Sequence, residues 1–303
     1  MTAIVGILNR RGVAIAADSA STLKKKIINT GNKMLRLSDK APIAVMVVNN
    51  SSLVGIPWEV IIRWYRKESK QEKYGSMEKY ISSFHSFVQD KILSRPDVQD
   101  EKVIFNNEAC SYLVYAGYGM KEQKPSIQEY EIYGIDHRKL LVRKTIRYEV
   151  SSPDKEVIIY SEGQPDIVRA YVEGVIDKRV SSIVDGHISI LKHCMKVIFY
   201  RSTSSLDEEA LKAKFKNVID GCKKDSKEDW LNTIKEYSLQ EMASLAENLI
   251  KATELHKKMA DLEEEVGGLI DLAVITKNDG FQWLNRKSWY EPSKGGQYGK
   301  FGI

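Results

Sequence analysis

Apolar residues in the first part of the chain occur in short runs, which is the pattern of buried strands. Residues 3–8 and 13–17 are apolar or small at every position, and the NRRG segment between them ends in glycine, as a hairpin turn does. Two further short runs are bounded by turn residues, at 34–37, which is apolar except for Arg36, and at 43–48. Strands that are apolar throughout predict a sheet covered on both faces.

Helical and strand patterns then follow one another in blocks. Residues 57–65 and 77–93 repeat apolar side chains at helical spacing, and residues 109–160 are rich in Tyr, Ile and Val between turns. Residues 165–259 have helical spacing again, and an apolar strand follows at 269–276. Hairpin connections between the strands predict two antiparallel sheets with helices packed outside both.

Composition narrows the class of protein. The chain has 303 residues, of which 43% are hydrophobic and 29% charged, so it can bury a substantial core and is not disordered. Its apolar runs are far shorter than the roughly 18 residues of a membrane span. The net charge of +5 is spread along the chain, which argues against a nucleic-acid partner.

Cysteine and histidine usage bears on compartment and cofactors. The three cysteines lie far apart and form no CxxC pair, and positive charges follow the N-terminal apolar run instead of preceding it. These features predict a reducing, cytoplasmic setting rather than secretion. The five histidines have no metal-ligand spacing, so we expect neither a metal nor another cofactor.

Thr2 is the first candidate for chemistry. An N-terminal Met followed by a small residue is normally removed, so we expect a mature chain that begins with Thr2. A hydroxyl and a free α-amine then belong to one residue, and the amine, with an ordinary pKa of about 7.7–8.0, can serve as the base. A Met-Thr start alone is weak evidence, because many chains have it.

Four separated segments add to this signal. They are residues 2–7 (TAIVGI), 12–22 (GVAIAADSAST), 32–37 (NKMLRL) and 263–276 (EEEVGGLIDLAVIT). Together they resemble mature proteasome β-subunits and the simpler bacterial proteasome-like peptidase that works with an unfoldase ring. The resemblance implies an α+β fold, the four-layer αββα sandwich of N-terminal-nucleophile hydrolases.

The resemblance also implies roles for three residues. Thr2 would be the nucleophile, with its own α-amine as the base. Lys33 would lie beside it as a cation and lower the pKa of the amine and of the hydroxyl through its charge. Asp18 would hold Lys33 charged and oriented. The plainer alternatives are a solvated lysine at a strand edge for Lys33 and a turn cap for Asp18.

Two supporting residues follow from the same resemblance, and two positions depart from it. Glu263 falls where the family has an aspartate near the amine of the nucleophile. Ser161, or its neighbour Glu162, falls near the family's Gly-Ser-Gly, although Ser161 has an equal claim to be a hydroxyl at a helix start. Val266 replaces a family serine, and residues 47–51 contain no counterpart of the glycine whose N–H serves the oxyanion.

The same resemblance implies how the chain is organised and what it does. We expect one domain over residues 1–303, with a core at 1–163 and 263–285, an enlarged helical segment at 164–262 and a loose tail at 291–303. The resemblance favours a threonine peptidase that acts on peptides or proteins as a homo-oligomer, in a ring as in its relatives, with any ATPase unfoldase a separate chain. The alternatives are an inactive scaffold or assembly protein and a small-molecule amidase on the same fold.

Overall fold

The hairpin at the start of the chain lies at the centre of the first sheet. In the computed structural model, β1 (Ile4–Asn9) and β2 (Gly12–Ala17) pair with Asn9 opposite Gly12, as the NRRG segment predicts. Every residue of both strands is buried. The sheet has the order β13-β1-β2-β14-β15 with antiparallel pairs throughout, and its other strands are β13 (Ile158–Glu162), β14 (Asp271–Thr276) and β15 (Gly280–Asn285).

The structure describes residues 2–23, 26–28, 31–69, 72–106, 109–151, 155–174, 177–197, 207–259 and 266–287.

The second sheet lies against the first and is also antiparallel. Its order is β12-β11-β10-β6-β5, with a short β9 paired to β11. Its strands are β5 (Met34–Arg36), β6 (Ile43–Asn49), β9 (Lys102–Ile104), β10 (Ser111–Gly117), β11 (Ser126–Asp136) and β12 (Lys139–Glu149). Two small hairpins lie outside both sheets, namely β3 (Ser21–Leu23) with β4 (Lys26–Ile28) and β7 (Ser52–Leu53) with β8 (Ile56–Pro57).

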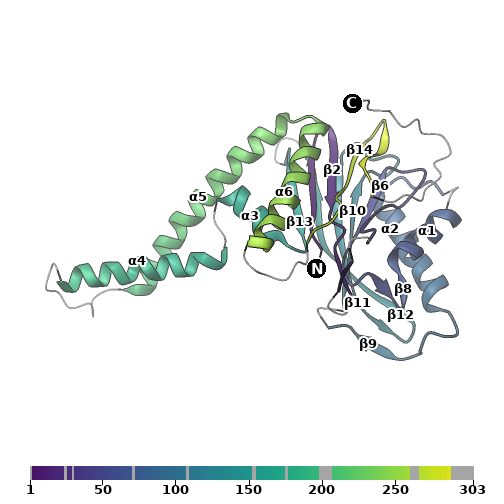
Figure 1. The fold of residues 1–303 in the computed structure, drawn as a ribbon. Coiled ribbons are helices and arrows are strands. Elements are labelled where there is room, and N and C mark those ends of the chain that lie inside the picture. Colours follow the sequence, from purple (N-terminus) through teal and green to yellow (C-terminus); the bar gives the residue numbers. More distant parts are fainter. Residues whose placement is uncertain are drawn as a thin grey trace.

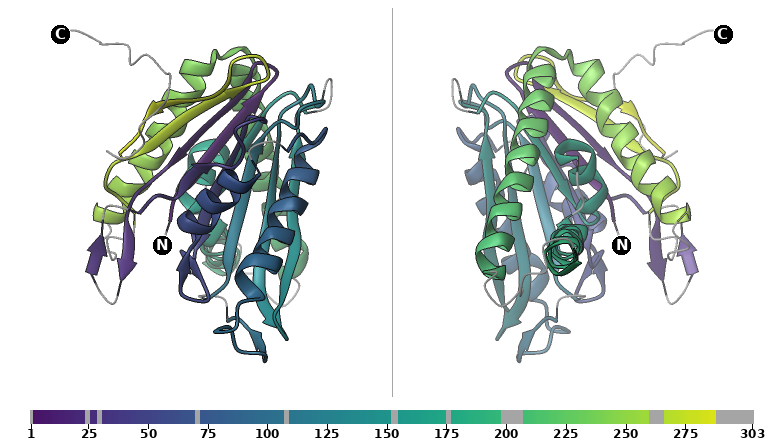
Figure 2. Two further views of the ribbon diagram at one scale, coloured as in Figure 1. Left: turned by 90° about the vertical axis from the view of Figure 1, so that its right-hand side faces the viewer. Right: turned by 90° about the vertical axis from the view of Figure 1, so that its left-hand side faces the viewer.

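Helices cover the outer faces of both sheets (Figures 1 and 2). The second sheet carries α1 (Trp58–Glu68) and α2 (Met77–Phe87), and α2 continues into a π-helical turn, η1 (Val88–Leu93). The first sheet carries α3 (Pro165–Glu173) and α6 (Leu239–Met259). Helices α4 (Asp177–Val197) and α5 (Glu208–Glu236) extend away from the sandwich, and only the last part of α5 returns to the first sheet (Figure 1).

Three apolar clusters separate these four layers. One fills the space between the sheets, one lies between the second sheet and the helices α1 and α2, and one lies between the first sheet and α6. Along β1 the side chains alternate, because Ile4 belongs to the cluster between the sheets and Val5 to the cluster under α6. The predicted four-layer αββα sandwich, with an enlarged helical layer over the first sheet, is confirmed.

The predicted helix at 77–93 is present, but its hydrogen bonding changes within it. It is an α-helix to Phe87 and a π-helix from Val88 to Leu93. Val88, Ile92 and Leu93 of the π-helical turn are buried in the cluster between the second sheet and the helices α1 and α2.

Two further expectations concern the organisation of the chain. The division of the chain into core and helical segment stays a prediction, and the tail at 291–303 lies outside the described residues. In the part of the chain that the structure describes, no helix is long and apolar enough to cross a membrane.

His85 on α2 generates a prediction about stability and pH. Its Nε2 lies 3.2 Å from the Tyr115 hydroxyl oxygen, and burial lowers the pKa of His85 to about 4. An unfolded histidine has a pKa of about 6.5, so between these values the unfolded chain binds more protons than the folded one. We therefore expect His85 to destabilise the fold by about 2 kcal/mol when the pH falls from 7 to 5.

The measurement is urea unfolding of the wild type and of His85→Gln at both pH values. The loss of unfolding free energy on acidification should be smaller in His85→Gln by about that amount. An equal loss in the two proteins would contradict the assignment.

Candidate functional site

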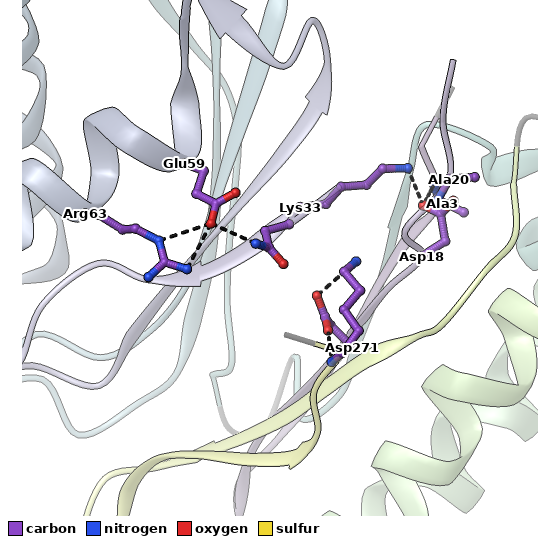
Figure 3. A network of polar contacts seen from close by, with 9 residues as sticks. Ala3, Asp18, Ala20, Lys33, Glu59, Arg63 and Asp271 are labelled. Carbon is purple, nitrogen blue, oxygen red and sulfur yellow. Dashed lines mark hydrogen bonds and ion pairs between the residues drawn. The ribbon is translucent and has the colours of Figure 1, made fainter. Parts of the chain in front are cut away.

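A buried ion pair joins the two sheets at one end of the sandwich. Asp18 follows β2 in the first sheet, and Lys33 precedes β5 in the second. Lys33 Nζ lies 2.7 Å from Asp18 Oδ1, and the two side chains are 7% and 0% exposed (Figure 3). Charges this deeply buried are stable only when they are paired and hydrogen-bonded. The structure therefore brings together the two residues that the sequence predicted as partners.

Backbone N–H groups complete the coordination of Asp18. Ala3 N–H donates to Oδ1 at 2.9 Å, and the N–H groups of Ala20 and Gly267 donate to Oδ2 at 3.2 and 3.3 Å. With Lys33, the carboxylate accepts four hydrogen bonds, which fills its capacity and fixes its orientation. The bond from Ala20 also makes Asp18 the cap of a turn, and its role in the chemistry of the site stays a prediction.

Thr2 is held beside this carboxylate. Ala3 exchanges two hydrogen bonds with Asp18, because its carbonyl also accepts the Asp18 N–H at 3.1 Å. Thr2 precedes Ala3 and is 4% exposed. On its other side is Gly163, in a left-handed conformation with φ +83°, where a Cβ atom would overlap the Thr2 carbonyl oxygen. The segments that contain Asp18 and Gly163 thus fix the backbone around Thr2, the first through Ala3 and the second by direct contact.

The charge state of Lys33 reflects opposing influences. Burial lowers the pKa of Lys33 below its ordinary value, and Lys287 lowers it further, whereas the charge and hydrogen bond of Asp18 raise it. Asp18 thus favours the charged form of Lys33, but burial has the larger effect on the pKa of Lys33. Lys33 consequently gives up its proton more readily than a solvated lysine does.

A second buried ion pair, which sequence reasoning missed, lies close by. Asp271 begins β14 opposite Ala17, the neighbour of Asp18. Lys287 lies just beyond β15; its Nζ is 3.2 Å from Asp271 Oδ2, and its N–H donates to Oδ1 at 3.1 Å. The side chains are 4% and 2% exposed. An aspartate within the apolar run LIDLAV was the available signal, because unpaired aspartates are almost never fully buried.

Of the two supporting residues, the structure describes Ser161 only. Ser161 lies on β13 opposite Val5, so its side chain lies on the face that carries the α6 cluster rather than between the sheets. It lines a cavity of about 670 Å³ between β13, α3 and α5. The alternative as a hydroxyl at a helix start is not seen either, because α3 begins at Pro165 with Gln164 as its N-cap. Glu263 lies outside the described residues.

The two departures from the family pattern have structural counterparts. Val266 is 2% exposed and packs in the cluster under α6, so the position of the family serine is occupied by a core side chain. The backbone of Gly267, the next residue, contacts the segment after Asp18. The Gly267 carbonyl accepts hydrogen bonds from the N–H groups of Ser19 and Ala20. Within 47–51, Asn49 adopts φ +66°, a left-handed conformation that glycine and asparagine favour.

Comparisons with known proteins show a likeness in solved structures only. No family model matches the chain, and no curated protein does. Anbu, an ancestral beta-subunit from Yersinia bercovieri, has a TM-score of 0.48 at 11% identity, over 93% of this chain and 86% of that one. The Gly-1 mutant of Anbu from Hyphomicrobium sp. strain MC1 has a TM-score of 0.47 at 12% identity, over 95% and 86%. We draw no functional argument from likenesses at this level.

The contact between Gly163 and Thr2 generates a prediction. Gly55 has nearly the same backbone conformation, φ +79°, but its missing Cβ would meet nothing within 4 Å. Gly55→Ala should therefore lower the free energy of unfolding only by the cost of an alanine in that conformation, about 1 kcal/mol. Gly163→Ala adds a clash with the Thr2 backbone and should cost about 3 kcal/mol or more.

Urea unfolding of the two variants measures the difference, with Gly55→Ala as the matched control. Equal losses of stability would show that Gly163 does not hold Thr2.

Proposed function

We propose that this chain is an N-terminal threonine hydrolase, a proteasome-like peptidase that uses Thr2 once Met1 has been removed. The observation that carries the proposal is the buried pair of Asp18 and Lys33, joined through Ala3 to the backbone of Thr2. A lysine and an aspartate buried together beside the residue expected to become the N-terminus match the chemistry that an N-terminal nucleophile needs.

The proposed reaction has two steps. The Thr2 hydroxyl oxygen attacks the substrate carbonyl, and the α-amine accepts the hydroxyl proton. The amide C–N bond breaks as that proton passes to the leaving amine, so that the acyl group remains on Thr2 as an ester. Water then cleaves the ester and restores the hydroxyl. Positive charge on Lys33 favours the neutral, basic form of the nearby α-amine.

Supporting roles are proposed for the remaining sequence candidates. Glu263 is the acidic residue we propose near the α-amine, as the family resemblance implies. Ser161 acts on the site only through β13, which leads into Gly163, because the Ser161 side chain lies on the opposite face of the sheet from Ile4. The proposed chemistry uses no metal or other cofactor.

The proposal extends to assembly and setting. We propose peptide or protein substrates, a cytoplasmic homo-oligomer such as a ring, and a separate ATPase if substrates must be unfolded. Exposed apolar side chains on the projecting helices, Ile190 at 62% and Val218 at 65%, supply surface for contacts between subunits.

One observation favours a second candidate, an inactive scaffold. Val266 fills the position of the family serine with a buried apolar side chain, which removes a hydroxyl from the proposed network. A small-molecule amidase is the third candidate, because the fold does not determine the substrate.

Substitution of Thr2 tests the proposal. Thr2→Ala should lose roughly a thousand-fold or more in turnover, because no side chain can form the ester. Thr2→Ser keeps a hydroxyl and should retain measurable activity. The assay is a panel of fluorogenic peptides and small acyl amides, on protein whose intact mass shows the loss of Met1.

The control is Thr233→Ala, which removes an exposed hydroxyl on α5 and should react like the wild type. Turnover by Thr2→Ala equal to that of the wild type, or retention of Met1 in an active protein, would contradict the proposal. Turnover of small amides alone would favour the amidase, and no turnover at all the scaffold.

A further inference from the structure

The pair of Asp271 and Lys287 lies in the same space as the pair of Asp18 and Lys33. Asp271 is opposite Ala17 across the β2–β14 ladder, and Ala17 faces the space between the sheets. Residues opposite each other in a ladder share a face, so Asp271 points between the sheets as well. Figure 3 shows Asp271 near the end of the sandwich where Lys33 reaches Asp18.

Lys287 is a buried ammonium group held by Asp271. An ammonium group can donate three hydrogen bonds. Lys287 Nζ is shielded from solvent and lies 3.2 Å from Asp271 Oδ2. Burial lowers the pKa of Lys287, whereas the charge and the hydrogen bond of Asp271 raise it. Burying an ammonium group costs free energy of folding that its attraction to a partner carboxylate often does not offset. A role in the electrostatics of the site accounts for its retention there.

The charges around Thr2 indicate in which direction Lys287 shifts the pKa of the α-amine. Two ion pairs supply two carboxylates, Asp18 and Asp271, and two ammonium groups, Lys33 and Lys287. Glu162 is opposite Ile4 across the β1–β13 ladder and so faces the same space as a third carboxylate, and burial raises the pKa of Glu162. The nearby Glu59 also acts on Lys287, but Arg63 pairs with it at 2.9 Å. Within each pair the charges cancel, and each ammonium group opposes a further positive charge beside it. Lys33 and Lys287 therefore both favour loss of the proton from the α-amine of Thr2.

We propose that Lys287, held by Asp271, is a positioning residue of the site, whose buried ammonium group cancels the charge of Asp271 and so keeps the α-amine of Thr2 in its neutral, basic form. For its catalytic consequence this inference rests on the proposed function. Its effect on Lys33 does not, because Lys33 and Lys287 are like charges whichever reaction the site performs.

The sign of each effect follows from Coulomb's law. Lys287 lowers the pKa of Lys33, so removing Lys287 should raise it. Removing Asp271 leaves Lys287 uncompensated, so the pKa of Lys33 should fall. Removing both charges should return it close to the wild-type value. The pKa of the α-amine should move in the same directions.

The first experiment follows the titration of Lys33 by NMR in the full chain labelled with ¹³C,¹⁵N-lysine, with Lys33→Arg to assign its signal. Lys287→Met should raise the midpoint by roughly one pH unit, Asp271→Asn should lower it similarly, and the double variant should restore it. An unchanged midpoint in folded Lys287→Met would overturn the inference. If Lys287→Met does not fold, Asp271→Asn decides the question by the opposite sign.

The second experiment follows kcat/KM against pH for the same proteins. The midpoint of the acidic limb should move to a higher pH, by roughly one unit, in Lys287→Met and to a lower pH in Asp271→Asn. In the double variant it should return to the wild-type pH. Lys287→Arg, which keeps the charge, should retain the wild-type profile. Lys251→Met is the matched control, since Lys251 pairs with Glu247 on the surface of α6 and should leave the profile unchanged.

The outcomes separate the two claims. A role in packing alone would lower kcat most in the double variant without moving the profile, which would overturn the inference. Lys33 midpoints that shift as expected in a protein without turnover would count against the proposed function only. Turnover with an unshifted Lys33 would count against this inference only.

Discussion

The site depends on the ion pair between Lys33 and Asp18, the point at which the two sheets meet through charge rather than apolar contact. Asp18 is fully buried, and its carboxylate gathers donors from three segments besides Lys33. Breaking a buried pair by removing one partner typically costs about 3–5 kcal/mol, because an uncompensated charge remains. This pair therefore holds the N-terminal residues in the fold. The backbone of Thr2, next to Ala3, is held in position by the same contacts.

A second layer of constraint surrounds the pair. Gly163 and Gly267 lie far from Thr2 in sequence, yet one packs on its carbonyl and the other donates to Asp18. Both have positive φ values, so glycine suits these positions for conformation as well as for space. Asp271 and Lys287 add two buried charges that cancel each other. The site is thus fixed in geometry by backbone contacts and in charge by two pairs.

The sequence predicted what depends on local patterns and on the family motif. The NRRG turn, the apolar strands and the helix after Pro57 follow from spacing, and the motif paired Asp18 with Lys33. Ser161 shows the limit of the motif, because a shift of one residue along a strand moves a side chain to the other face of the sheet. Lys287 could not be predicted, since its partner is fixed by the fold of β14 against β15 and not by any local spacing.

The central claim is that the buried pair activates Thr2. Its most direct measurement is the rate at which a covalent inhibitor directed at N-terminal threonine forms an adduct, followed by intact mass with the modified residue located by fragmentation. We predict one adduct, on Thr2, that forms at least roughly a hundred-fold more slowly in Lys33→Ala. An adduct on another residue, or equal rates in folded Lys33→Ala and in the wild type, would contradict the account.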